Sequence, residues 1–559
     1  MKTIQYITTT AFATLVSLNS CDFLDETPQG ILSEEQAKNP SSVEGLVTAA
    51  YSALGNDHYD KPFSLWPYGN VRADDAYKGG NDPTDIQDFH YYELSENIKT
   101  DFAEANDLWF YMYEAISRCN SALEVLNSID ESSYKLKNVR MGEMYFIRGH
   151  FYFMLKIIYG HIPYVDETTP LDDYVKVTNT LPNDELWSKI CNDFQRAHDL
   201  LPESQLEVGR ANRIAAAAYL AKAYLYKAYR QDEKNNVTEI NDDDLEKVLT
   251  FSNEVIASGY GLESDFACNF LPGGYQNGKE SIFAVQYSQD DGTMFGRLNW
   301  GDVLSVPQGL GCCDFHKPSQ NLVNAYKTVN GLPDFENYDT QDYVVNETAA
   351  DPRLFHTVAM PGVPYKYNEE LIYEEDWNRT PNIYGVYASL KENVDPTCDC
   401  FHNVSPFYAN SKNRIVLRYA DVLLFRAEAL IELNRESEAR PLINEVRERA
   451  KASTLFIPYA KNLNINSYPA TGWTNSFARE ALRWERRLEF AMEGSRFFDL
   501  VRWGIADQVM NAYFNKESQR RSYLSGGKFD KNQDEYIPIP QQQINFVGSD
   551  VYKQNAGWD

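Results

Sequence analysis

The chain of 559 residues is poor in positive charge. It has 52 lysines and arginines against 81 aspartates and glutamates, which gives a formal net charge of −29 at pH 7. Proteins that bind a nucleic acid backbone neutralise its phosphates with lysine and arginine, so this balance argues against nucleic acid as a partner. The acidic excess instead predicts a well-solvated body that is exposed to water.

The motifs of common catalytic machineries are also missing. The chain contains no Gly-x-Ser-x-Gly elbow, no His-Glu-x-x-His zinc motif, no Walker loop and no dinucleotide fingerprint. Acidic residues are so numerous that some pair will lie at the ~5–10 Å separation that glycosidases use, which makes such a pair uninformative. We therefore predict a protein that is not an enzyme, with no catalytic residues and no cofactor.

Apolar runs long enough to span a membrane are absent after the N-terminus. The apolar stretch Ile4–Leu18 is short and rich in threonine, so it does not suit a mature membrane helix either. With Lys2 before it and Cys21 after it, residues 1–20 have the organisation of a bacterial lipoprotein signal peptide, and Cys21 is the predicted lipidation site. Asn19 is unusual at its position, so plain secretion with an unlipidated Cys21 remains an alternative.

Cysteines are few, eight in all. Cys119, Cys191 and Cys268 stand alone, and we expect free thiols there. Four others lie near histidines: Cys312 and Cys313 precede His316, and Cys398 and Cys400 precede His402. Their spacing matches no structural zinc pattern, so we predict no metal site and leave disulfides or free thiols open. A bridge between Cys312 and Cys313 would make a rigid apolar plate that could support a ligand.

Helical periodicity dominates the rest of the chain. Apolar residues at helical spacing predict pairs of helices near residues 40–128, 138–200, 210–258 and 413–452. The last pair, from Arg418 to Ala450, is about 33 residues long, close to the ~34-residue tetratricopeptide period, and has alanines where two helices must approach. The predicted fold is mainly all-α, a tetratricopeptide-like solenoid of about four helical hairpins.

Two segments near residues 55–101 and 259–413 interrupt this solenoid. Both are rich in glycine, proline, aspartate, asparagine and aromatic residues, which predicts long irregular loops. The second is far longer than a repeat linker, and short strand-like runs such as Ser281–Tyr287 indicate local order in it. Binding residues are commonly displayed on such loops by a rigid scaffold, so we expect the ligand site there.

Six short motifs are notable for their order and spacing. They are CDFLD from Cys21, GEMYFIRG from Gly142, NRIAAA from Asn212, RYADVLL from Arg418, WERRLEF from Trp484 and YIPIP from Tyr536. Together, and over nearly the whole chain, they resemble the SusD/RagB family of Bacteroidetes outer-membrane lipoproteins, which capture glycans for import.

The resemblance implies a single SusD-like domain over residues 21–559, held at the outer-membrane surface by a lipid anchor. It also implies a glycan ligand and a SusC-like TonB-dependent transporter as partner. Asp22 and Asp25, directly after Cys21, resemble the signal that sends such lipoproteins to the cell surface. The arginines and glutamates of the motif from Trp484 to Phe490 are expected to be structural and paired if buried.

Two other functions remain open. RagB-type relatives serve peptide import, and their overall motifs would look the same. A tetratricopeptide-type scaffold that binds protein partners is the other alternative, although the two long interruptions count against it.

A glycan site needs flat aromatic faces and polar groups that satisfy hydroxyls. The predicted ligand-binding residues are Asp57, Trp66, Asp74, Asp75, Tyr77 and Asp82 from the first loop, and Trp300, Cys312, Cys313 and Arg379 from the second. The run Asp74–Gly80 resembles one common in the family where ligand often binds, although Asp74 could instead be a structural cap. Trp300, between Asn299 and Gly301, is the strongest candidate, because turn formers on both sides give it few packing neighbours; the alternative is that it fastens the loop to the solenoid.

Overall fold

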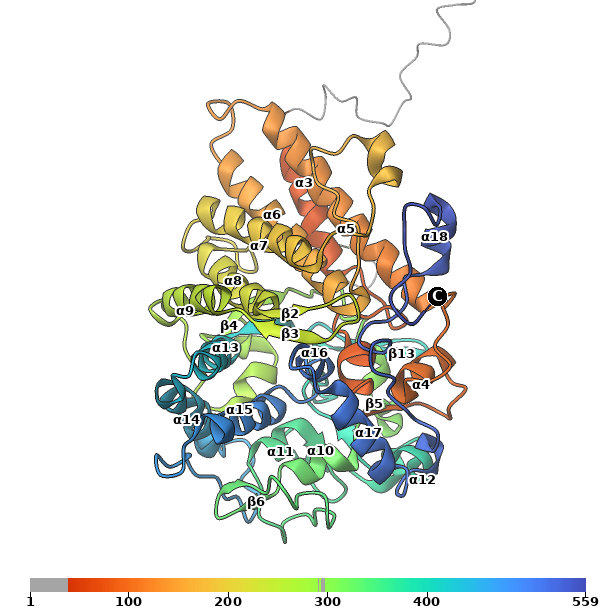
Figure 1. The fold of residues 1–559 in the computed structure, drawn as a ribbon. Helices are drawn as coiled ribbons and strands as arrows, with labels where there is room; N and C mark the ends of the chain where they lie inside the picture. Colours follow the sequence, from red (N-terminus) through yellow and green to blue (C-terminus); the bar gives the residue numbers. More distant parts are fainter. Residues whose placement is uncertain (1–38, 290, 293–296, 559) are drawn as a thin grey trace, which may run out of the picture.

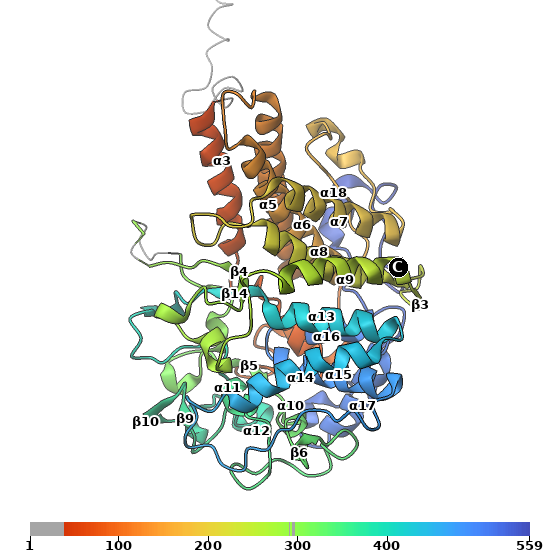
Figure 2. The same cartoon turned by 90° about the vertical axis from the view of Figure 1, so that its left-hand side faces the viewer.

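Paired helices form one side of the molecule and irregular segments the other (Figures 1 and 2). The computed structural model describes residues 39–289, 291–292 and 297–558. The predicted signal peptide, Cys21 and the acidic residues after it lie outside the described residues. Among those that are described, no helix is both long and apolar enough to span a membrane.

The predicted helical pairs are confirmed. They are α3 (Pro40–Ser52) with α5 (Ala103–Ser128), α6 (Lys137–Tyr159) with α7 (Asn183–Leu200), α8 (Arg213–Ala228) with α9 (Asp242–Ile256), and α13 (Tyr419–Glu432) with α14 (Glu436–Ala452). Successive pairs also contact each other, since α5 packs on α6, α7 on α8, and α9 on α13. Figure 2 shows the pairs following one another from top to bottom, as expected for a solenoid.

Local sequence explains why α8 and α9 pack so closely. Seven alanines of α8 are buried, and their small side chains let the neighbouring helix approach. The Asn212 side chain caps α8 by accepting a hydrogen bond from the Ala215 N–H at 2.8 Å, and Asn241 caps α9 in the same way through Asp244 N–H. The predicted polar break between these helices contains a hairpin of β2 (Tyr229–Gln231) and β3 (Val237–Ile240).

The first predicted loop is more ordered and more buried than its composition suggests. It contains η3 (Pro67–Val71), β1 (Ala76–Gly79) and α4 (Gln87–Leu94), and residues 65–80 are all buried. The strand β1 pairs with β5 (Phe315–Pro318) of the second predicted loop. The two loops therefore form one layer, and much of the first is core.

The second predicted loop is built from short elements. The expected strand is β4 (Ser281–Val285), which pairs with β14 (Arg414–Arg418). The others are α10 (Gln320–Ala325), β6 (Thr328–Val329) with β7 (Leu332–Pro333), α11 (Arg353–Thr357), β8 (Val358–Ala359) with β11 (Ala388–Ser389), β9 (Pro364–Tyr365) with β10 (Asn368–Ile372), α12 (Pro381–Tyr384), and β12 (Phe401–Val404) with β13 (Phe407–Asn410). Each strand pair is a two-stranded sheet, so this region is held by packing rather than by one large sheet.

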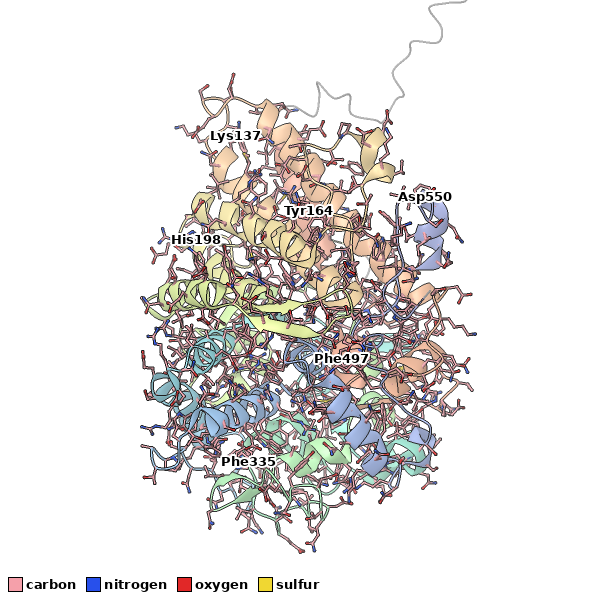
Figure 3. All side chains as sticks on the ribbon, viewed as in Figure 1. Lys137, Tyr164, His198, Phe335, Phe497 and Asp550 are labelled. Atoms are coloured by element: carbon pink, nitrogen blue, oxygen red, sulfur yellow. A yellow bond between two sulfur atoms is a disulfide. The ribbon has the colours of Figure 1, made fainter. Side chains whose placement is uncertain are left out.

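Four helices after the last hairpin close the fold. They are α15 (Asn475–Phe490), α16 (Arg496–Arg502), α17 (Ala506–Glu517) and α18 (Gln541–Val547). Figure 3 shows Phe497 of α16 near the middle of the molecule, where its buried ring lies 4.1 Å from the Arg72 guanidinium. These helices thus connect the solenoid to the irregular layer.

The charged motif on α15 is buried and paired, as predicted. Glu489 pairs with Arg353, Arg418 and Arg449, which come from three other parts of the chain. Glu485 pairs with Arg353 and with Arg447. A buried charge left without its partner would be costly, so this network fixes α15 against the last helical hairpin and the second insertion.

Candidate functional site

Six of the predicted ligand-binding residues are buried: Cys312, which is 6% exposed, and five from the first loop, which serve as framework. Asp57, Trp66, Asp74, Asp75 and Tyr77 are each at most 6% exposed. The prediction that they contact a ligand directly is not supported by this burial. The tertiary structure explains this burial, because each of these side chains packs against a distant part of the chain.

Asp74 and Asp75 are held by arginines from the end of the chain. Arg496 donates to both Asp74 carboxylate oxygens at 2.9 and 3.0 Å, and Arg487 donates to Asp75 Oδ1 at 2.7 Å. Burial alone would raise the pKa of Asp74, but Arg487 and Arg496 lower it to about 2. The Tyr77 hydroxyl donates to the Glu517 carboxylate in the same region.

Trp66 and Asp57 lie beneath the strongest predicted ligand contact. The Trp66 indole donates a hydrogen bond to the Gly301 carbonyl at 3.2 Å. The Asp57 carboxylate accepts from Phe63 N–H at 3.0 Å, and burial raises its pKa to about 6. It lies so close to Gly301 that a Cβ at that position would be 2.1 Å from Asp57 Oδ2. These contacts fix the backbone that carries Trp300.

Trp300 itself is partly exposed, in a group of rings from both loops. Its ring stacks with His58 at a centroid distance of 5.8 Å and meets Phe407 edge-on at 6.3 Å. The His58 side chain is 40% exposed. Residues 58 and 300 are far apart in sequence, so the joining of the two loops creates this surface.

Next to these rings lies a loop with a disulfide. Cys312 is bonded to Cys313, and Cys398 to Cys400, which resolves the open question about these cysteines. We call residues 308–313 the disulfide loop. Its glycines are covered by rings, since a Cβ on Gly309 would lie 2.4 Å from the Trp377 ring and one on Gly311 2.4 Å from the Tyr408 ring.

The rings and the disulfide loop form a strip of pairwise contacts: Trp300 contacts His58 and Phe407, and the Tyr408 and Trp377 rings cover the disulfide loop. We call His58, Trp300, Phe407, Tyr408 and Trp377 the aromatic row. Phe407 and Tyr408 are neighbours on β13, and Tyr408 also stacks on Phe401 of β12 at 5.3 Å. His58, Phe407 and Tyr408 were absent from the sequence-based site. The turn formers Ser405-Pro406 between two short runs that each begin with an aromatic residue, Phe401 and Phe407, are the signal that could have indicated a hairpin here.

Arg379 and Asp82 form a polar group beyond the aromatic row. The Arg379 side chain is 35% exposed and lies 3.3 Å from Asp85 Oδ2, while its backbone N–H donates to Asp314 Oδ2 at 2.8 Å. Asp82 accepts hydrogen bonds from the Thr84 N–H and hydroxyl, and these bonds lower its pKa. Arg379 lies two residues after Trp377, so the same segment carries one ring of the row and this polar group.

Chemically, this strip is suited to binding. It offers ring faces, a guanidinium fork and carboxylates at a surface built on fixed framework residues. In the part of the chain that the structure describes, no group of three or more histidine, cysteine or acidic side chains is arranged to hold a metal ion.

Fold and surface together define a tetratricopeptide-like scaffold that displays a binding surface on long insertions. The chain belongs to the SusD family, because residues 279–558 match the model of that family. Residues 22–225 match a second model, described as starch-binding associating with outer membrane.

Known proteins resemble the chain over nearly its full length. SusD-like protein P2 of Formosa agariphila is 25% identical over 97% of this chain and 98% of its own. A SusD-like carbohydrate binding protein of Bacteroides fragilis has a crystal structure that matches with a TM-score of 0.71 and 22% identity, over 92% of this chain and 99% of that one. A structure described as a laminarin binding SusD-like protein matches with a TM-score of 0.66 and 21% identity, over 93% and 99%. The structural matches establish the fold.

Proposed function

We propose that the protein is a non-catalytic glycan-binding lipoprotein of the outer-membrane surface, which captures oligosaccharides and delivers them to a SusC-like TonB-dependent transporter. Membership of the SusD family supports this, as do the names of relatives that bind laminarin or carbohydrate. The description of the second matching family supports an outer-membrane location. The lipid anchor on Cys21 and the transporter partner belong to the proposal.

The aromatic row is the observation on which the proposal depends. Sugar rings present C–H groups on one face, which pack on flat aromatic side chains such as Trp300 and Tyr408. Asp82 and Arg379 would satisfy hydroxyl groups, since charged donors and acceptors form the stronger hydrogen bonds. The Cys312–Cys313 bridge would support the row from below.

A strip of several weak contacts favours a chain of sugars over a single unit. Once one sugar unit is bound, the next unit of the same chain is held close to the row, so its binding costs less. We therefore expect oligomers to bind more tightly than monomers. Closure over a transporter would replace the hydration of the ligand with protein contacts.

The test is binding of the purified ectodomain to a glycan array, followed by calorimetric titration of any glycan that binds. We expect the octamer of that glycan to bind at least about tenfold more tightly than the monosaccharide. Equal affinities would contradict the avidity argument, and release of reducing ends from a polysaccharide would contradict the non-catalytic role.

The same purified protein distinguishes the two alternatives. Capture of peptides from a library, with no glycan bound, would favour RagB-type peptide import. Binding of a helical segment or tail of another protein, without a small ligand, would favour a tetratricopeptide-type scaffold. The lipid anchor is tested by labelling the full-length protein with a fatty-acid analogue. If Cys21→Ala is no longer labelled, the result supports lipidation of Cys21. If the variant is still labelled, Cys21 is excluded as the lipidation site.

A further inference from the structure

A cavity of about 150 Å³ lies where the solenoid meets the irregular layer. Its walls come from α6, α8, α13, α15, β14 and the segment that precedes β14. None of the five rings of the aromatic row lines it. Figure 2 shows the surrounding elements, with β4 and β14 close to α8 and α13. This cavity is therefore distinct from the proposed glycan surface.

Three basic side chains line the cavity without an ion pair. Lys412 is 6% exposed, and its ammonium has no hydrogen-bond partner among the residues that the structure describes. The Lys222 ammonium, within the same residues, contacts only rings, lying 5.0 Å from the centroid of Phe153. The Nε and Nη2 atoms of Arg414 are buried without a hydrogen-bond partner.

The acidic groups of the cavity are already engaged elsewhere. Asp302 accepts from the Ser64 hydroxyl at 2.5 Å and from the Asn299 amide at 2.7 Å. Glu392 Oε1 lies 2.8 Å from His316 Nδ1.

Glu493 and Asp421 complete the acidic lining. Glu493 pairs with Lys391 at 2.6 Å and with Arg418 at 3.0 Å. Asp421 accepts from the Arg418 N–H at 3.2 Å, and burial raises the pKa of its carboxyl to about 6. Among the described residues, these carboxylates form no ion pair with Lys412, Lys222 or Arg414, although Asp302 and Asp421 lie close enough to favour the charged forms of the basic groups.

Burial of an ammonium group that has no carboxylate within ion-pair distance is unfavourable. Burial lowers the pKa of both Lys412 and Lys222, although nearby carboxylates act in the opposite direction. Apolar cavities can stay empty, but one lined by charged groups takes up polar contents. Water supplies hydrogen-bond acceptors without charge, whereas an anion supplies acceptors together with negative charge close to the unpaired ammonium groups.

We propose that this cavity binds a small inorganic oxyanion of the size of phosphate or sulfate, held by Lys412, Lys222 and Arg414. The volume of about 150 Å³ is several times the ~30 Å³ that one water occupies, so a tetrahedral oxyanion fits together with a few waters. Lys222 belongs to α8, whereas Lys412 and Arg414 lie at the end of the second insertion. The bound anion would join the solenoid to the layer that carries the aromatic row.

The test uses the purified protein, dialysed free of oxyanions and titrated with phosphate at an ionic strength matched with sodium chloride. A ligand that binds only the folded state raises the unfolding temperature, so we expect phosphate to raise the midpoint more than chloride does. In Lys412→Met and Lys222→Met, the dissociation constant for phosphate should rise at least about tenfold. Lys451→Met, an exposed lysine at the end of α14, is the matched control and should bind phosphate as the unmodified protein does.

Diffraction gives a second readout that does not depend on a variant that folds. Crystals of the unmodified protein soaked in selenate should show an anomalous peak inside the cavity, between Lys412 and Lys222. A peak there supports the proposal. A cavity that contains only water after soaking, or phosphate and chloride shifts that are equal, would overturn it.

Discussion

At the scale of residues, the structure separates buried side chains of the proposed site from exposed ones. Trp66 and Asp57 fix the Gly301 backbone from below, and neither is more than 6% exposed. Trp300 next to it is partly exposed and stacks with His58. A residue's position in a predicted loop therefore does not show whether its side chain is exposed, because residues of the same loop can be buried or exposed.

Trp300→Ala should weaken glycan binding at least about tenfold, about 1.4 kcal/mol, because large aromatic anchors dominate such surfaces. The fold should remain intact, since the ring is at the surface. Calorimetric titration with the array-selected glycan measures the affinity, and circular dichroism checks the helices.

Phe546→Ala is the matched control for that substitution. Phe546 is a ring of α18 that is 76% exposed and outside the aromatic row. The Phe546→Ala protein should bind glycan with the same affinity as the unmodified protein. Equal losses in Phe546→Ala and Trp300→Ala would show that the row has no special role.

Asp74→Asn should reduce the free energy of unfolding by about 3–5 kcal/mol, because it removes the carboxylate partner of Arg496 and leaves Arg487 with Asp75 alone. Arg487 and Arg496 both pair with Asp74. Chemical denaturation measures the loss. Asp82→Asn makes the same change at a partly exposed position of the same loop and should cost little stability. If the Asp74→Asn protein is as stable as the unmodified protein but binds glycan poorly, Asp74 contacts the ligand after all.

At the scale of elements, the disulfide loop and the β12–β13 hairpin act as one unit. Gly311 has a φ of +116°, and the Tyr408 ring covers it so closely that no side chain fits between them. Trp377 covers Gly309 of the same loop. The glycines therefore let two rings of the row approach the loop backbone.

Gly311→Ala should displace Tyr408 and lower glycan affinity several-fold, in addition to a backbone cost of about 1–3 kcal/mol. Gly362→Ala is a close control, because Gly362 also has a positive φ, of +78°, and a Cβ added there would have no atom within 4 Å. Calorimetry and denaturation on both variants separate ring displacement from strain. If both variants lose the same affinity, the position of Tyr408 does not matter.

At the scale of the whole molecule, buried ion pairs connect the end of the chain to its beginning and middle. Asp74 has a pKa of about 2, and arginines hold the pKa of Glu493 and Asp499 below the ordinary value despite burial. Such groups stabilise the fold above the pKa of the unfolded chain, about 4, and the stabilisation is lost as pH falls through the folded pKa.

We therefore expect stability to fall steeply between about pH 4 and pH 2. Burial raises the pKa of Asp57 and Asp421 to about 6, so both are protonated in the folded state across this range, and their opposing contribution ends below about pH 3, where the unfolded carboxyls are protonated too. Thermal unfolding followed by circular dichroism across this range measures the effect. A midpoint that stays constant from pH 4 to pH 2 would contradict it.

The sequence by itself determined the helical pairs, the strand at Ser281–Val285 and the family, because periodicity and short motifs are local properties of the chain. It also indicated that the charges of α15 must be paired. The position of Trp300 between turn formers was likewise readable, although its role as a ligand contact remains a prediction.

Only the tertiary structure decided which loop residues face solvent. Asp75 meets Arg487 across 412 positions of sequence, and Asp74 meets Arg496 across 422. No local pattern encodes such a partner, so a polar, glycine-rich loop could be read as surface when it is core. The aromatic row arises in the same way, because His58, Trp300 and Phe407 become neighbours only when two insertions pack on one scaffold.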